Sequence, residues 1–230
     1  MESGAGWGKY VVTHAVVQAD RMAMSNPDTR SRILATAQAL FFAKGFGHVG
    51  TNTICQEAKV NKGTLYHFFS SKTDLAIAAL EDYGSLSRQE IERIVRGPAQ
   101  PLAKLKRVLS LPLKAARANK AQGRPLWGCL VGNLAVEMAA ENEAIATCTQ
   151  AIFEAWRVAL EPLIEELSST RDLGPLKPRF GAEALLAYME GVTVMAKAHN
   201  QPAWIARLIP GGLGLLQQLS REQVQRGGRP

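Results

Sequence analysis

Residues 51–75, with the sequence TNTICQEAKVNKGTLYHFFSSKTDL, limit the possible folds of this chain more than any other segment. Residues 51–53 offer side-chain oxygens that can cap a helix, so we expect a helix to start near Thr53. The apolar positions of this helix are Ile54, Ala58 and Val60. Residues 61–63, Asn-Lys-Gly, then supply turn chemistry and a new cap. The segment therefore predicts a short helix, a tight turn and the start of a second helix.

The second short helix has a small apolar side and a polar outer face. Leu65, Phe68 and Phe69 recur at helical spacing, so we expect them to be buried. The residues left for the outer face are Lys62, Gly63, Thr64, Tyr66 and His67. Hydroxyl, imidazole and ammonium groups can donate to phosphate oxygens or base edges, and a glycine lets the backbone approach a phosphate closely. This arrangement is typical of a helix-turn-helix DNA reader, whose second helix enters the major groove.

A third helix is expected to begin directly after this pair. Ser70, Ser71 and Lys72 open it, and Asp74 lies in its first turn. A helix N-terminus that carries a lysine is a natural clamp for a phosphate. Each residue taken alone has an ordinary alternative, since an exposed Tyr-His pair or a single lysine is often only a solvated surface. The DNA-binding interpretation depends on the whole ordered set in residues 51–75, called the reader segment below.

The stretch from about Thr29 to Tyr83 resembles the N-terminal domain of the tetracycline-repressor (TetR) family of transcriptional regulators. Residues 41–46 resemble the end of the first helix of that domain, and the runs GTLYHFF and SK-DL are specific to it. The resemblance implies an N-terminal three-helix DNA-binding domain followed by a helical ligand-binding and dimerisation domain. The DNA contacts that it implies come from Thr53, Lys62, Thr64, Tyr66, His67 and Lys72, to which Gly63 is added for close backbone approach.

Two residues depart from the usual pattern of the family. Lys59 stands where the family usually has glycine, at the turn after the second helix of the domain. If Lys59 lies at positive φ, it carries strain of about 1 kcal/mol or more; alternatively, its side chain reaches a phosphate. Asn61 stands where the family often has serine, and asparagine also caps helices and tolerates the left-handed region.

The two halves of the chain differ in charge. Among the 230 residues, 1–126 carry 18 Lys and Arg against 9 Asp and Glu, whereas 127–220 carry 6 against 10. The net charge of +7 is compatible with a nucleic-acid partner, and the basic excess lies in the half of the chain that holds the reader segment and the helices just after it. We expect a DNA-binding domain at 28–75, a ligand-binding and dimerisation domain at 76–222, and a tail at 223–230. Residues 1–27 are expected to form a disordered extension, or in part to reflect a start assigned too early.

The composition argues against several other classes of protein. The three cysteines, Cys55, Cys129 and Cys148, do not have the spacing of metal ligands, so we expect no metal site. Their odd number suggests no disulfide framework, which is compatible with a reducing cytoplasm. We expect no cofactor. No apolar run is long enough to span a bilayer, and no membrane partner is expected. The chain lacks a phosphate-binding glycine loop and a Ser-centred elbow, and its histidines are scattered, so we do not expect an enzyme.

No β-strand alternation persists along the chain, which predicts an all-α fold. Helices are expected at residues 72–96, 102–119, 127–140, 141–167, 180–199 and 202–218, with kinks at Pro112 and Pro162. The last two helices are rich in small and apolar residues on more than one face, and such helices must be buried from several sides. We expect this pair to form a four-helix bundle with its twofold mate in a homodimer. The alternative is an ordinary core within one chain.

Residues 124–139, RPLWGCLVGNLAVEMA, are the second unusual segment. They resemble a branch of the same family with a GCLVGNLA-type sensor helix, some members of which respond to reactive electrophiles or small unsaturated acids. Cys129 stands at the expected helix start, where the helix dipole favours a thiolate, so it is a candidate sensing thiol. A buried cysteine also serves as a small core hydrophobe. The candidates for lining an effector pocket are Trp127, Cys129, Asn133, Glu137, Trp156, Tyr188 and His199.

Together these features favour a ligand- or electrophile-responsive transcriptional repressor that acts as a homodimer on a palindromic double-stranded DNA operator. Its effector is a small molecule whose identity the sequence does not specify. Two alternatives stay open. One is a small-molecule or electrophile-binding module with weak or lost DNA binding, and the other is a transcriptional activator of the same family.

Overall fold

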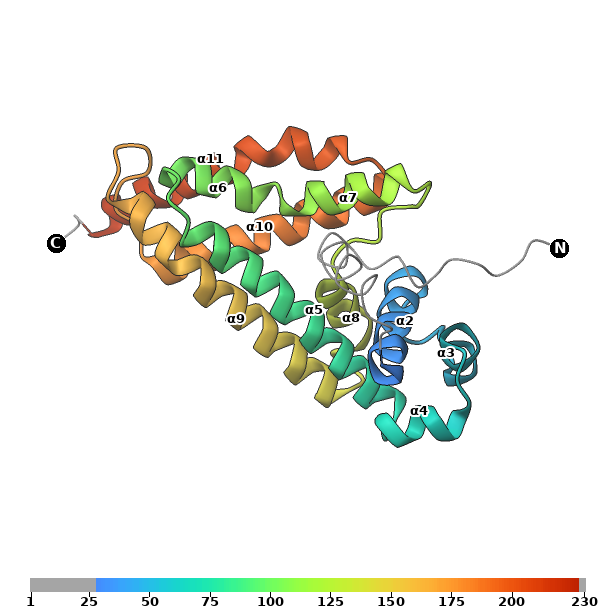
Figure 1. Ribbon diagram of the computed structural model, residues 1–230. Helices are drawn as coiled ribbons and strands as arrows, with labels where there is room; N and C mark the ends of the chain where they lie inside the picture. Colours follow the sequence, from blue (N-terminus) through green and yellow to red (C-terminus); the bar gives the residue numbers. More distant parts are fainter. Residues whose placement is uncertain (1–27, 228–230) are drawn as a thin grey trace. The chain divides into compact units, whose positions relative to one another are not determined.

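The computed structural model describes residues 28–227, and every regular element in that range is a helix (Figure 1). This confirms the predicted all-α class. The chain divides into two compact units: unit 1 holds residues 28–86 and Leu130–Ile152, and unit 2 holds Ser87–Cys129 and residues 153–227. Residues 1–27, for which a disordered extension was expected, lie outside the described residues.

Unit 1 is built around helix α2, Thr29–Lys44, which contacts both α3, Thr51–Ala58, and α8, Leu130–Met138. Helix α4, Lys62–Phe68, contacts α3, and α5, Lys72–Val95, begins in the same unit. The fully buried side chains of this core include Ile33, Phe41, Ile54, Leu65 and Leu75. Apolar residues of the reader segment therefore share one core with α2, and this core fixes the orientation of α3 and α4.

The helix boundaries in the reader segment correct two expectations. Helix α3 begins at Thr51, not near Thr53, and its N-cap is Gly50, which makes no side-chain cap. Phe68 was expected to be buried but is 37% exposed. The reason is that α4 ends at Phe68, and Phe69 adopts an extended backbone with φ −138° and ψ 113°. This change of backbone conformation turns Phe69 into the core instead.

Unit 2 contains α6, Pro101–Leu109, α7, Leu111–Ala121, and the long pair α10, Pro178–His199, and α11, Ala203–Gly227. The single kinked helix expected at 102–119 is in fact α6 and α7, because Pro112 lies in the first turn of α7, where a missing N–H costs little. Helices α10 and α11 run side by side (Figure 1). Helix α11 continues through Gly227, well past the expected end at 218.

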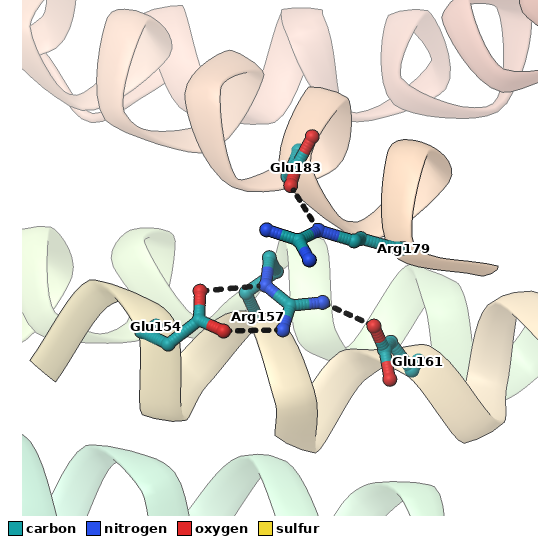
Figure 2. Close-up of polar contacts among 5 residues, drawn as sticks. All are labelled: Glu154, Arg157, Glu161, Arg179 and Glu183. Carbon is teal, nitrogen blue, oxygen red and sulfur yellow. Dashed lines mark hydrogen bonds and ion pairs between the residues drawn. The ribbon is translucent and has the colours of Figure 1, made fainter. Parts of the chain in front are cut away.

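Helix α9, Glu143–Ser168, contains Pro162 and carries an ion-pair network in its unit 2 part (Figure 2). Arg157 is only 7% exposed and donates to both oxygens of Glu154, at 2.8 and 2.5 Å, and to Glu161. The hydrogen bond from Arg157 lowers the pKa of Glu154, and the same bond raises the pKa of Arg157. Two carboxylates on the same helix thus accept hydrogen bonds from a mostly buried guanidinium and balance its charge.

Candidate nucleic-acid interface

Helix α4 is fixed by one cap and one apolar anchor. The Asn61 side-chain oxygen accepts from the Thr64 backbone N–H at 2.7 Å and from the Thr64 hydroxyl at 3.0 Å. This confirms the predicted cap at Asn61. Leu65 is the one residue of this seven-residue helix that is fully buried. Because the Thr64 hydroxyl proton is used by Asn61, the group left for a base edge is the Thr64 oxygen as an acceptor, with its methyl group beside it.

The opposite side of α4 faces solvent. Lys62, Gly63 and His67 are exposed, and Tyr66 is 47% exposed, which is high for an aromatic side chain. Thr53 on α3 is half-buried. A lysine, a tyrosine and a histidine are thus exposed together on one short helix whose position is fixed at Leu65. The face offers hydrogen-bond donors and a positive charge to a partner.

Lys72 is the first residue of α5 and lies close to the loop that follows α2. The Ser71 hydroxyl oxygen accepts from the Asp74 backbone N–H at 3.0 Å and caps the start of this helix. The Lys72 ammonium lies 4.0 Å from the centre of the Phe46 ring, in a cation–π contact. Partial burial lowers the pKa of Lys72, and the carboxylate of Glu137 acts in the opposite direction. Lys72 therefore stands at a helix N-terminus, as expected of a phosphate clamp, and is already held by Phe46.

The turn between α3 and α4 contains a strained residue, and an arginine of α2 that the sequence did not single out donates to the end of α3. Lys59 has φ 53° and ψ 50°, the left-handed conformation that was considered for it. The Arg32 Nε donates to the Ala58 carbonyl at 2.9 Å and so satisfies the end of α3. A surface depression of about 470 Å³ lies here, lined by Thr29, Arg32, Cys55, Gln56, Lys59, Val60, Asn61 and Thr64. An arginine in the first turn of α2 carried no signal in the sequence because its partner is 26 residues away.

Glu137 was grouped with the effector-pocket candidates, but its carboxylate is bound to the backbone of unit 1. The Phe46 N–H donates to one oxygen at 2.9 Å, and the Gly47 N–H donates to the other at 2.7 Å. Asn133, one turn earlier on α8, is half-buried. The signal that could have shown this contact is the pair of glycines around Phe46, which leaves the backbone accessible to a carboxylate.

The other effector-pocket candidates lie in unit 2. Trp127 and Trp156 are buried, and the Tyr188 hydroxyl donates to the Leu208 carbonyl at 2.5 Å. His199 is exposed and stacks on Trp204, with ring centres 4.2 Å apart. These four side chains therefore already have protein partners or sit in apolar core, and a role for them in ligand binding is still a prediction.

Cys129 directly precedes the first residue of α8 and is 9% exposed. Burial raises the pKa of Glu190 on α10, and a hydrogen bond between this carboxylate and Cys129 acts against that rise. Sequence reasoning missed Glu190, because 61 positions separate the two residues. Burial also raises the pKa of the Cys148 thiol to about 11, with the Glu81 carboxylate adding to the effect. Cys148 is therefore poorly suited to react as a thiolate.

Known protein families match both parts of the chain. The family described as bacterial regulatory proteins, tetR family, matches residues 33–79, which include α3 and α4. The tetracyclin repressor-like C-terminal domain matches residues 101–210. Among curated proteins, the transcriptional regulator AcuR of Cereibacter sphaeroides is 30% identical over 161 residues, which cover 69% of this chain and 72% of AcuR. The chain belongs to the TetR family of DNA-binding transcriptional regulators, which is not a family of enzymes.

Solved structures agree with this assignment. The crystal structure of the regulatory protein TetR from Rhodobacter sphaeroides is 25% identical and has a TM-score of 0.73, covering 81% of this chain and 98% of that one. The reduced form of NemR from Escherichia coli has the same fold, with 23% identity and a TM-score of 0.69, and the match covers 84% of this chain and 97% of NemR. NemR is named a transcriptional repressor, and it is 33% identical over 69 residues, which are 30% of this chain and 35% of NemR. Within residues 28–227, no helix is both long enough and apolar enough to cross a membrane.

Proposed function

We propose that this protein is a ligand-responsive transcriptional repressor that binds a palindromic operator as a homodimer. The observation that carries the proposal is the exposed face of α4, where Lys62, Tyr66 and His67 are solvent-accessible on a helix fixed by Asn61 and Leu65. The half-buried Thr53 and Thr64, the close backbone at Gly63 and the clamp at Lys72 complete the proposed contact set. Base contacts from α4 and phosphate contacts around it are what a helix-turn-helix needs.

Glycines in α10 and α11 support the proposal of a homodimer. A Cβ at Gly181 would lie 2.7 Å from Ile164, and a Cβ at Gly212 would lie 2.8 Å from Leu109, so packing within the chain explains these two glycines. At Gly191 and Gly214, a Cβ would meet no atom of the described residues within 4 Å. A helical glycine costs about 0.5–1 kcal/mol relative to alanine. Close approach of a second copy accounts for glycine at these two open positions.

The same surface of α10 is also apolar. Val194 and Met195 are exposed side chains a short distance along the helix from Gly191. Large apolar side chains on the outside of a packed helix mark a surface that a partner covers. A twofold interface of α10 and α11 would bury them, and two copies of a helix-turn-helix would then address two half-sites.

Cys129 is the proposed sensing thiol of the effector site. A half-buried carboxylate with a raised pKa is a better proton acceptor at neutral pH than an ordinary one, and Glu190 is such a group beside this thiol. Transfer of the thiol proton to Glu190 would leave a thiolate that adds to the β-carbon of an electron-poor alkene. The π-electron pair of the alkene moves to the α-carbon, which takes the proton back from Glu190.

The first experiment is selection of bound sequences from random duplex DNA, followed by affinity measurements on the selected site. Lys72→Ala is expected to weaken binding about tenfold and to lower the slope of affinity against salt by about one. Tyr66→Phe removes one hydroxyl and is expected to weaken binding less. Lys120→Ala, at an exposed lysine of α7, is the matched control and should bind as the wild type does. Failure to enrich any sequence would contradict the proposed function.

Two further measurements test the dimer and the thiol. Gly191→Leu fits the single chain but places a side chain in the proposed interface, so the protein should sediment as a monomer. Gly191→Ala is the conservative control, and a dimer that survives Gly191→Leu would exclude this surface. Treatment with a thiol-reactive electrophile should release the wild-type protein from its operator and leave Cys129→Ser bound. Equal release of both would assign sensing to another group.

A further inference from the structure

The loop of residues 45–47, Gly-Phe-Gly, forms a small binding site for a carboxylate within unit 1. Gly45 has φ 79° and ψ 166°, a conformation that is accessible almost only to glycine. The backbone N–H groups of the next two residues both point at the Glu137 carboxylate, at 2.9 and 2.7 Å. Two N–H groups on one charged acceptor make charge-assisted hydrogen bonds, which are stronger than neutral ones.

The two glycines leave the space that the carboxylate occupies. A Cβ on Gly45 would lie 2.8 Å from one Glu137 oxygen, and a Cβ on Gly47 would lie 3.2 Å from the other. Only a residue without a side chain fits at the first position without moving Glu137. The 45–47 loop is therefore shaped around the end of a side chain that comes from α8, 90 residues further along the chain.

Phe46 connects this carboxylate to the proposed phosphate clamp. Its N–H is bound to Glu137, while its ring lies 4.0 Å from the Lys72 ammonium and packs on Phe41 with ring centres 5.6 Å apart. The Phe46 ring is nearly buried, so its position depends on its backbone. A change in the bond to Glu137 must therefore change where the Lys72 ammonium is held.

We infer that Glu137 is a positioning residue for DNA binding: through Phe46 it orients Lys72 at the start of α5, and so makes operator affinity depend on α8. The inference deepens the proposed function and rests on it. Glu137 follows Cys129 by eight residues and lies in the helix Leu130–Met138, which starts directly after Cys129. An effector event that shifts α8 would withdraw the carboxylate from the 45–47 loop and release Lys72 from the orientation that binds DNA.

The test is a double-mutant cycle between Glu137 and Lys72, measured as affinity for the selected operator. In Glu137→Gln the amide oxygen can accept from one N–H, but the amide NH₂ faces the other, so the paired contact is broken. This variant is expected to bind the operator about tenfold more weakly than the wild type. In a Lys72→Ala background the same change is expected to have no further effect. Glu141→Gln, an equal change of charge at an exposed glutamate after α8, is the matched control and should bind normally.

Two additional measurements separate positioning from general loss of structure. Amide hydrogen exchange should quicken at Phe46 and Gly47 in Glu137→Gln while the core amides of α2 keep their protection. Glu137→Asp keeps the charge but has a shorter side chain, so it should weaken operator binding. It should lower the melting temperature less than Glu137→Gln does. Equal operator affinity in wild type and Glu137→Gln, or an equal loss with and without Lys72, would overturn the inference. If wild-type protein selects no site at all, the proposed function itself fails.

Discussion

The reader segment and the α10–α11 pair are stabilised in different ways. Helix α4 has seven residues and one fully buried side chain, and its start is fixed by the Asn61 cap. Helix α10 has 22 residues and several buried positions, and it packs along α11. A short helix is marginal without help, so its position depends on caps, turns and a few anchors. The comparison teaches that single residues control the geometry of the DNA-binding face, whereas the α10–α11 pair depends on a broad packed surface.

Backbone conformation shows the same contrast. Around the reader segment, Gly45 and Lys59 both have positive φ, one before α3 and one after it. In the α10–α11 pair the corresponding residue is Asn200, which ends α10 in the left-handed conformation and joins it to α11. Residues at positive φ set the direction of the chain at a fixed point, and one of them lies on each side of α3. Changes at such points should alter the geometry of the proposed DNA-binding face more directly than changes on the surface of α10.

Replacement of Leu65 by alanine should give the largest loss. The side chain is fully buried and is the main apolar anchor of α4, so removing it leaves a cavity and loosens the helix. We expect the free energy of unfolding to fall by about 3–4 kcal/mol. Urea denaturation measures this change, and Val136→Ala, at a valine of α8 that is 89% exposed, should stay within about 0.5 kcal/mol of the wild type. A loss below 1 kcal/mol would mean that α4 is held by more than this anchor.

Gly45→Ala should produce the next largest effect. A Cβ at this position is strained by the φ of 79° and would lie 2.8 Å from a Glu137 oxygen. We expect a loss of about 2–3 kcal/mol in the free energy of unfolding, together with weaker operator binding. Gly50→Ala is the control, since Gly50 has φ −83° and a Cβ there would meet nothing within 4 Å. Similar losses in the two variants would contradict the role given to the 45–47 loop.

Local chemistry explains why most of the reader segment could be predicted from the sequence. The caps at Asn61 and Ser71 join residues three positions apart. The left-handed conformation of Lys59 was considered because the family that the segment resembles usually has glycine at this position. The burial of Phe68 was wrongly predicted because helical spacing does not show where a helix ends. One residue beyond that end, the extended Phe69 takes the buried position.

Contacts distant in sequence explain what could not be predicted. Glu137 and Asn133 share a face of α8 by helical spacing, but no local rule shows that the loop at Phe46 is the partner of Glu137. The hydrogen bond between Cys129 and Glu190 is of the same kind. Which side chains surround an effector depends on such pairs, and for this reason the sequence supports a proposal for the DNA-binding face but not one for the ligand.

Lys59→Gly should have a smaller effect, and in the stabilising direction. Glycine adopts the left-handed conformation at no steric cost, so the strain at φ 53° is relieved. We expect the free energy of unfolding to rise by about 0.5–1 kcal/mol, since the greater freedom of glycine in the unfolded chain offsets part of the gain. Lys59→Asn removes the charge but also tolerates this conformation. Operator affinity that falls equally in both variants would assign Lys59 a phosphate contact in addition to its strain.

The smallest effect concerns the pH dependence of the cap on α2. The Asp28 carboxylate accepts from the Ser31 backbone N–H at 2.7 Å, and this bond lowers its pKa from 3.8. Because the folded pKa lies below the unfolded one, the stabilisation is fully present above the unfolded value. It is lost as the pH falls through the folded pKa.

Asp28→Asn keeps a capping oxygen but does not titrate, so the difference in stability between wild type and variant should be constant near neutrality and shrink below pH 3.8. Urea denaturation of both proteins between about pH 6 and pH 2 measures it, and other carboxylates cancel in the comparison. A difference that does not change with pH would mean that the Asp28 cap does not depend on its charge.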